Sequence, residues 1–221
     1  DFLISRDIER LSAITRDDIV AFEAHLFECG FAASTVSRRI SVVKGFHRFC
    51  VAEDYTQENP DAALPLPKTP ERLPDVLTID QVDKLFDAFD GEGAAGVRDR
   101  AMLEVLYGCG LRVSELCGLD RSDVVLDQGY LLVLGKGGKQ RISPISGEAA
   151  TALADYLENA RPQLCKPYAK PTDAVFLNAR GGRLTRQSVF KVVARAGLAI
   201  GVENLHPHTL RHSFATHMLQ G

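Results

Sequence analysis

The spacing of apolar residues predicts helices on both sides of a proline-rich stretch. Near the N-terminus, Ile19, Phe22 and Leu26 recur at the spacing that places side chains on one face of a helix. Thr15 and Asp18 precede this run in a capping-box pattern, which is typical of a helix start. The first predicted element is therefore an amphipathic helix that ends near residue 30.

A second helix is predicted over residues 34 to 51, with an apolar face that includes Val36, Ile40 and Cys50. Another face of this helix carries polar and basic residues at helical spacing: Ser37, Arg38, Ser41, Lys44 and Arg48. Such a stripe can bind the phosphates of a nucleic acid, or it can be an ordinary solvated surface. Spacing alone slightly favours the surface, and both interpretations stay open at this point.

Half of the ten prolines fall within residues 60–74. Proline fixes the backbone and lacks a hydrogen-bond donor, so this composition favours an extended connector. The pattern predicts two domains: a helical N-terminal domain over residues 1–59 and a larger domain over 75–221, joined by the linker 60–74.

The second domain reads as mainly helical with a small β-hairpin. A capping box at Thr78 predicts a helix through Phe89, and a mostly buried helix is expected from 99 to 107. Further predicted elements are strands at 131–134 and 141–145 around the turn GKGGKQ, a helix at 148–157, a strand at 175–177, a helix from Thr185 and a last helix over 208–219. The fold class is therefore mainly α, with an α+β arrangement in the second domain.

Composition narrows the class of protein. The net charge of −3 and the pI near 6.1 mean that any surface for nucleic acid must be local. No stretch has the length and apolarity of a membrane span, and the N-terminus does not resemble a signal peptide, so we expect a cytoplasmic protein. The five cysteines form no CxxC pair and are expected to be reduced thiols, buried as small apolar groups.

Two arginines far apart in the sequence, Arg112 and Arg211, are candidates for binding an anion. Arg112, in GLRVSEL, precedes Glu115 by three residues, so the carboxylate can orient the guanidinium. Arg211, in HPHTLRH, borders a predicted apolar arc of Leu210, Phe214 and Met218 and has no obvious anionic partner nearby in the sequence. Guanidinium groups bind phosphate oxygens bidentately, which makes a phosphate the expected ligand, although a surface ion pair and a snorkelling arginine explain each residue taken alone.

The histidines and the hairpin admit further interpretations. His208 and His212 have the i, i+4 spacing of zinc ligands, and His206 is a candidate third ligand, but the glutamate of a zinc protease motif is absent. We expect His25, His47 and His217 at the surface or at the edge of a core.

In the hairpin, LGKGGKQR lacks the Walker pattern, and its basic residues Lys136, Lys139 and Arg141 are candidates for contact with a ligand.

GLRVSEL, LGKGGKQR and HPHTLRHSFATH, in this order behind a small helical domain, resemble the tyrosine recombinases (phage integrase family), and specifically the Xer type. The resemblance implies a site for one scissile DNA phosphate. Arg112 and Arg211 would hold the non-bridging oxygens, His208 would bind the phosphoryl group and assist proton transfer, and Lys136 would protonate the leaving 5′ oxygen. The resemblance implies no metal and no other cofactor.

The resemblance also implies a biological setting: double-stranded DNA bound by a clamp of two domains, a homo- or heterotetramer with a sister recombinase, and a division-associated activator protein. Chromosome dimer resolution is the implied role, and the alternatives are a mobile-element integrase or a DNA-binding fragment or regulator without catalysis. In the family, a tyrosine forms a 3′-phosphotyrosyl link. None of the five tyrosines fits this position, so the 221-residue chain is expected to be inactive alone, and its N-terminal domain is expected to be incomplete.

Overall fold

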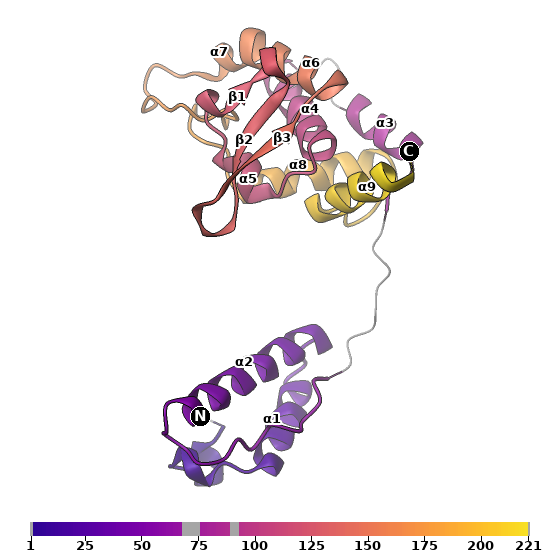
Figure 1. The fold of residues 1–221 in the computed structure, drawn as a ribbon. Helices are drawn as coiled ribbons and strands as arrows, with labels where there is room; N and C mark the ends of the chain where they lie inside the picture. The colour runs from indigo at the N-terminus through magenta and orange to yellow at the C-terminus, as the bar shows by residue number, and fades with distance from the viewer. Residues whose placement is uncertain (1, 68–75, 89–92, 221) are drawn as a thin grey trace. The chain divides into compact units, whose positions relative to one another are not determined.

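The computed structural model describes residues 2–67, 76–88 and 93–220, apart from the side chain of Lys136. The chain divides into two compact units, Asp1–Arg72 and Leu73–Gly221, and Figure 1 labels the helices and strands of each. Both units are mainly helical, and the second contains a small antiparallel sheet, so the fold class predicted from the sequence is confirmed.

The first unit consists of two short 3₁₀ turns, Ile4–Arg6 and Leu11–Ala13, followed by helices α1 (Arg16–Glu28) and α2 (Ala33–Ala52). Thr15 caps α1 as predicted, because its side chain accepts a hydrogen bond from the Asp18 amide while the Asp18 carboxylate accepts one from the Thr15 amide. The core joins the apolar faces of both helices to a residue that follows them: Ile19, Leu26, Val36, Ile40 and Leu64.

A buried polar pair also belongs to this unit. His47 is buried on α2, and its Nδ1 lies 2.6 Å from a carboxylate oxygen of Asp61, which is fully buried. The expectation of a surface or core-edge position for His47 is therefore wrong, because Asp61 lies outside the helix and the helical pattern could not show it. Asp61 and Leu64 are both buried in this unit, so the first part of the expected linker 60–74 packs here, and residues 68–74 lie outside the described part of the chain.

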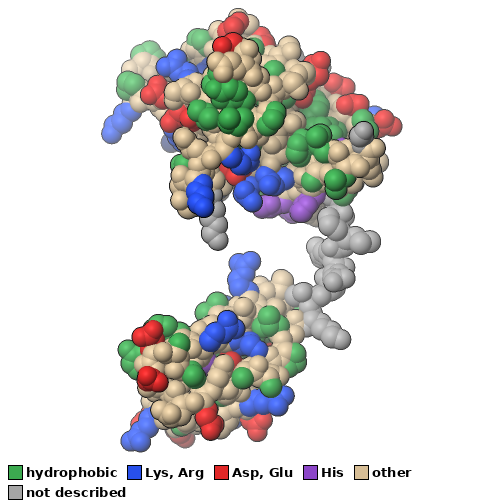
Figure 2. Space-filling model, viewed as in Figure 1, with side chains coloured by type: hydrophobic (Ala, Val, Ile, Leu, Met, Phe, Trp, Pro, Cys, Tyr) green, Lys and Arg blue, Asp and Glu red, His purple; other side chains and the backbone are tan. Residues whose placement is uncertain are grey.

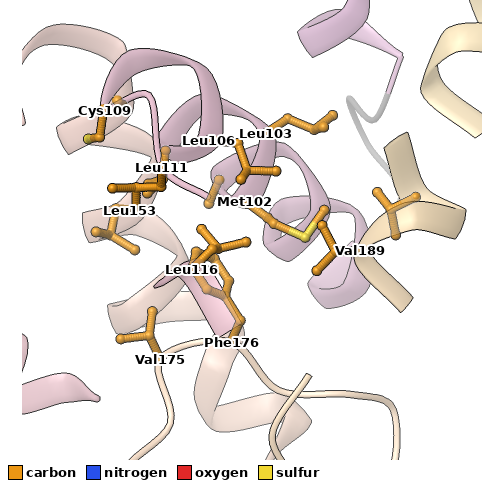
Figure 3. Packing of buried hydrophobic residues seen from close by; sticks show 14 of the residues in the cluster. Met102, Leu103, Leu106, Cys109, Leu111, Leu116, Leu153, Val175, Phe176 and Val189 are labelled. Carbon is orange, nitrogen blue, oxygen red and sulfur yellow. The ribbon is translucent and has the colours of Figure 1, made fainter. Parts of the chain in front are cut away.

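The second unit arranges its helices around one long buried helix. Its elements are α3 (Ile79–Asp87), α4 (Gly93–Gly108), α5 (Val113–Gly118), β1 (Val124–Val125), β2 (Tyr130–Leu134), β3 (Gln140–Pro144), α6 (Gly147–Asp155), a π-helical turn (Tyr156–Ala160), α7 (Arg161–Leu164), α8 (Arg186–Ala199) and α9 (Pro207–Gln220). Six successive positions of α4, 101–106, are buried, and all of them except Glu104 are apolar. Figure 3 shows Met102, Leu103 and Leu106 of this helix among residues from other elements. A helix that is apolar on all sides must lie inside a core, as α4 does.

The sheet follows the order β1, β2, β3 with antiparallel pairing throughout. In β2, Leu131 and Val133 are buried while Leu134 is exposed, which is the alternation expected of a sheet covered on one face. Val133 pairs with Arg141 in the register of β2 and β3. Because residues directly opposite each other share a face, Arg141 starts from the covered face of the sheet.

Several sequence predictions need correction. Val175–Leu177 is not a strand: isolated bridges join Asp120 to Ala174 and Leu177 to Arg183, and the segment between them is buried core, which explains its apolar pattern. The cysteines are free, but Cys29 and Cys165 are exposed rather than buried. Met218 is also exposed, so it does not extend the apolar arc of α9. The predicted helix end at Phe89 lies outside the described residues.

None of the described helices combines the length and the apolar character that a membrane span requires.

Candidate functional site

The site begins at the sharp turn between α4 and α5. Gly110 adopts a left-handed backbone (φ +56°), which glycine tolerates without strain. Arg112 follows as the residue that caps α5, and its backbone amide donates to Glu115 Oε2 at 2.9 Å. Its side-chain Nη1 donates to Glu115 Oε1, also at 2.9 Å. The expectation that Glu115 orients Arg112 is thus confirmed.

Two further arginines, from distant parts of the chain, lie next to Glu115. Arg141, on β3, donates from Nη2 to Glu115 Oε2 at 2.8 Å. Arg211, on α9, places Nη1 4.0 Å from the same oxygen and also donates from Nη1 to the carbonyl oxygen of Gly110. The partner that the local sequence could not supply for Arg211 is therefore part of the GLRVSEL segment.

Burial and charge explain the protonation states in this cluster. Burial opposes ionisation of Glu115, but hydrogen bonds from the Arg112 backbone and side chain and the charge of Arg141 outweigh it, so its pKa is lowered and it stays ionised. Burial and the neighbouring charges of Arg112 and Arg141 lower the pKa of Arg211 below its ordinary value, against the attraction of Glu115. Arg211 is therefore repelled by Arg112 and Arg141, and Glu115 offsets only part of this repulsion.

The cluster has the properties of an anion site. Three guanidinium groups face one carboxylate, so positive charge is in excess. The side chain of Glu115 is 3% exposed, whereas those of Arg112, Arg141 and Arg211 are 54%, 39% and 34% exposed. The carboxylate is thus covered, while its cations reach the surface, where they can bind phosphate oxygens.

His208 lies in the first turn of α9, three residues before Arg211, and is exposed. Its neighbours in the motif, His206 and His212, are exposed as well. Figure 2 shows Lys and Arg side chains adjoining His side chains on the surface of the second unit. Over the described residues there is no group of three or more His, Cys, Asp or Glu side chains that could hold a metal ion.

The hairpin residues lie at the tip between β2 and β3. Lys136 begins the turn Lys136–Gly138, in which Gly137 has φ +78°, and its side chain lies outside the described part of the structure. Lys139 is exposed, and its carbonyl oxygen accepts the Gly135 amide at 2.8 Å, which closes the base of the turn. Arg141, on β3, turns toward Glu115.

The polar stripe of the first unit lies on α2. Arg38, Ser41 and Arg48 are exposed, whereas Ser37 and Lys44 are half-buried. Lys44 Nζ donates to the carbonyl oxygen of Leu64, so this lysine also ties α2 to the segment that completes the core. Most of the stripe is therefore exposed to solvent, and Lys44 is hydrogen-bonded within its own unit.

Sequence reasoning missed the role of Glu115 as a shared partner and the position of Arg141. The signal for Arg141 was present in the alternation along β3 and the residue after it, where Ser143 and Ile145 are buried and Ile142 is exposed. Arg141 has the same parity as the buried pair, so it belongs to the inner face. Sequence reasoning also missed the 2.8 Å hydrogen bond between Tyr107 Oη and His217 Nδ1, which no local pattern predicts.

Comparison with known proteins identifies the family of the chain. Residues 75–221 match the model of the phage integrase family, and residues 1–54 match its N-terminal SAM-like domain. The chain belongs to the phage integrase family of tyrosine recombinases.

Its relatives place it within the Xer type. It is 41% identical over 221 residues to the tyrosine recombinase XerD of Staphylococcus epidermidis, which covers 100% of the chain and 74% of that protein. It is 43% identical over 220 residues to the tyrosine recombinase XerC of Herpetosiphon aurantiacus, covering 99% of the chain and 71% of the relative. The crystal structure of XerA recombinase superposes with a TM-score of 0.58 at 27% identity, covering 99% of this chain and 73% of that one.

Proposed function

We propose that this chain supplies the DNA clamp and the phosphate site of a site-specific recombinase that cuts and rejoins DNA through a 3′-phosphotyrosyl intermediate, in chromosome dimer resolution. The observation that carries the proposal is the convergence of Arg112 and Arg211, from separate segments, on the buried Glu115. Similarity to relatives named XerD and XerC supports the role in chromosome maintenance over that of a mobile-element integrase.

In this proposal Arg112 and Arg211 bind the non-bridging oxygens of the scissile phosphate. Their fixed charges offset the negative charge that develops at phosphorus. His208, in the first turn of α9, hydrogen-bonds the phosphoryl group and assists proton transfer, and Lys136 at the hairpin tip protonates the 5′ leaving oxygen. These four residues perform positioning and proton transfer, and none of these steps requires a metal.

Double-stranded DNA is the proposed substrate, bound by both units. The contacts proposed for the first unit are Ser37, Arg38, Ser41, Lys44 and Arg48, and those for the hairpin are Lys139 and Arg141. Assembly into a homo- or heterotetramer with a sister recombinase, response to a division-associated activator and a cytoplasmic location complete the proposal.

We expect the 221-residue polypeptide alone to form no covalent link to DNA. Tyr107 is engaged with His217, and burial, with a contribution from Asp83, raises the pKa of its hydroxyl, which disfavours the phenolate. Tyr156 is fully buried, and its hydroxyl donates to the Val175 carbonyl. These contacts favour, as the second candidate, a DNA-binding regulator without catalysis. The reading frame after Gly221 decides between them: a tyrosine-bearing helix supports the recombinase, and a stop codon supports the regulator.

The test of the phosphate site is Arg211→Lys in the complete gene product, with covalent trapping on a nicked suicide duplex that carries the recombination site. A lysine supplies a point charge and cannot reproduce the planar two-pronged grip, so we expect trapping to fall by at least about a hundredfold. Arg121→Lys is the matched control, because Arg121 forms an exposed pair with Asp173 at 3.4 Å. Full trapping by Arg211→Lys would place the phosphate elsewhere.

A further inference from the structure

Two arginines compete for one oxygen atom in the cluster. Arg141 Nη2 lies 2.8 Å from Glu115 Oε2, and Arg211 Nη1 lies 4.0 Å from the same atom. The first distance is that of a charge-assisted hydrogen bond, and the second is too long for one. The same carboxylate therefore holds Arg141 closely and leaves Arg211 at a distance.

We propose that Arg141 is a positioning residue that occupies Glu115 Oε2 and thereby prevents Arg211 from closing a salt bridge with it, which leaves the Arg211 guanidinium available to a phosphate. The inference rests on the proposed function, because it assigns Arg211 to the scissile phosphate. At the scissile phosphate Arg141 thus acts only through Glu115 and Arg211: its Nη2 stays on the carboxylate, and the exposed part of its side chain is left for the DNA contact proposed for the hairpin.

The burial of Glu115 is the reason that this competition matters. A carboxylate that is 3% exposed must be neutralised by protein groups, because water cannot reach it. Arg112 satisfies Oε1 through Nη1 and contributes its backbone amide to Oε2. If Arg141 is removed, Arg211 Nη1 still lies 4.0 Å from Oε2, and it must move only about 1 Å to reach hydrogen-bonding distance.

The sheet gives Arg141 the rigidity that this role needs. Arg141 pairs with the buried Val133 across β2 and β3, so its side chain leaves the backbone on the covered face, toward α5. Arg211 lies on a different element, α9, and is held to the turn before α5 through the carbonyl oxygen of Gly110. Arg141 therefore acts as a fixed spacer between Glu115 and the Arg211 guanidinium.

The test uses the 221-residue chain with ¹⁵N-labelled arginine, in which NMR detects the Nε–H groups, and inorganic phosphate is the probe. In Arg141→Gln we expect the Arg211 signal to shift and its exchange with water to slow, as its salt bridge with Glu115 closes. We expect the phosphate dissociation constant at Arg211 to rise by about three- to tenfold. In the double variant Glu115→Gln/Arg141→Gln the attraction is gone, and phosphate affinity should return at least to that of the wild type.

The coupling between the two substitutions separates positioning from direct contact. If Arg141 itself binds the phosphate, Glu115→Gln will not restore affinity in the Arg141→Gln background, and the inference is overturned. An unchanged Arg211 signal in Arg141→Gln overturns it as well. Arg121→Gln, which removes the same charge from an exposed pair, is the matched control and should leave both measurements unchanged.

Failure of the proposed function gives a different result. In that case the NMR coupling between Arg141, Glu115 and Arg211 is present, but the complete gene product forms no covalent complex with a suicide duplex. Loss of the coupling with normal covalent trapping overturns the inference and leaves the proposed function in place.

Discussion

The turn at Gly110 gives the sharpest test of how the fold builds the site. A Cβ atom added at Gly110 would lie 2.4 Å from Cδ1 and 2.6 Å from Cε1 of Phe214, which is on α9. The backbone of Gly110 is also left-handed, at φ +56°. Gly110→Ala therefore combines backbone strain with a collision between the α4–α5 turn and the helix that carries Arg211.

The magnitude follows from these two costs. A left-handed backbone costs a non-glycine residue about 1–2 kcal/mol. Forcing an extra carbon into a packed contact typically costs about 1–3 kcal/mol more. We therefore expect Gly110→Ala to lower the free energy of unfolding of the second unit by about 2–5 kcal/mol. Gly147→Ala is the matched control, because Gly147 also has φ +56° but has nothing within 4 Å of the added Cβ.

The assay is urea denaturation followed by circular dichroism, with hydrogen exchange of α4 and α9 peptides to separate the second unit from the first. Gly147→Ala should lose only the backbone contribution, about 1–2 kcal/mol. Phe214→Leu in the Gly110→Ala background should recover part of the loss, since it removes the ring that the methyl group meets. If Gly110→Ala and Gly147→Ala are equally stable, α9 does not pack against the turn as described, and the contact of Arg211 with Gly110 loses its basis.

Three further predictions concern other parts of the chain. Burial is the main cause that raises the pKa of Glu104 from 4.5 to about 7, so the wild type should lose stability as pH rises from about 4.5 to about 7. Glu104→Gln should lack this loss and have the higher urea midpoint above pH 7. Parallel pH profiles of the two proteins would contradict the assignment. Asp61→Asn breaks the buried pair with His47 and should destabilise the first unit by about 3 kcal/mol in thermal or urea unfolding, where an unchanged midpoint would show that the pair is dispensable. Arg48→Ala should weaken DNA binding in a gel-shift titration, most clearly at low salt, without loss of stability. Lys44→Ala should weaken DNA binding and also lower stability, because this lysine donates to a backbone carbonyl. Unchanged affinity in both variants would remove the stripe from the DNA surface.

The sequence was sufficient to predict those features that depend on interactions between residues close together in the chain. The cap at Thr15, the helix with Ile19 and Leu26 inward, and the hairpin around GKGGKQ depend on residues a few positions apart, and the structure contains all three. The pairing of Arg112 with Glu115 has the same origin, because three residues along a helix start bring the two side chains together.

Only the tertiary structure decided which distant residues share a partner. Arg141 and Arg211 reach Glu115 from a strand and a helix that follow it in the chain, and Asp61 reaches His47 of α2 from outside the helical pattern. A buried carboxylate requires compensating charge. The packing of α9 against α4 and of the sheet against α5 determines which cations lie beside Glu115. The sequence by itself thus determined the elements and the types of residue available for a phosphate site, and the packing of those elements determined the site.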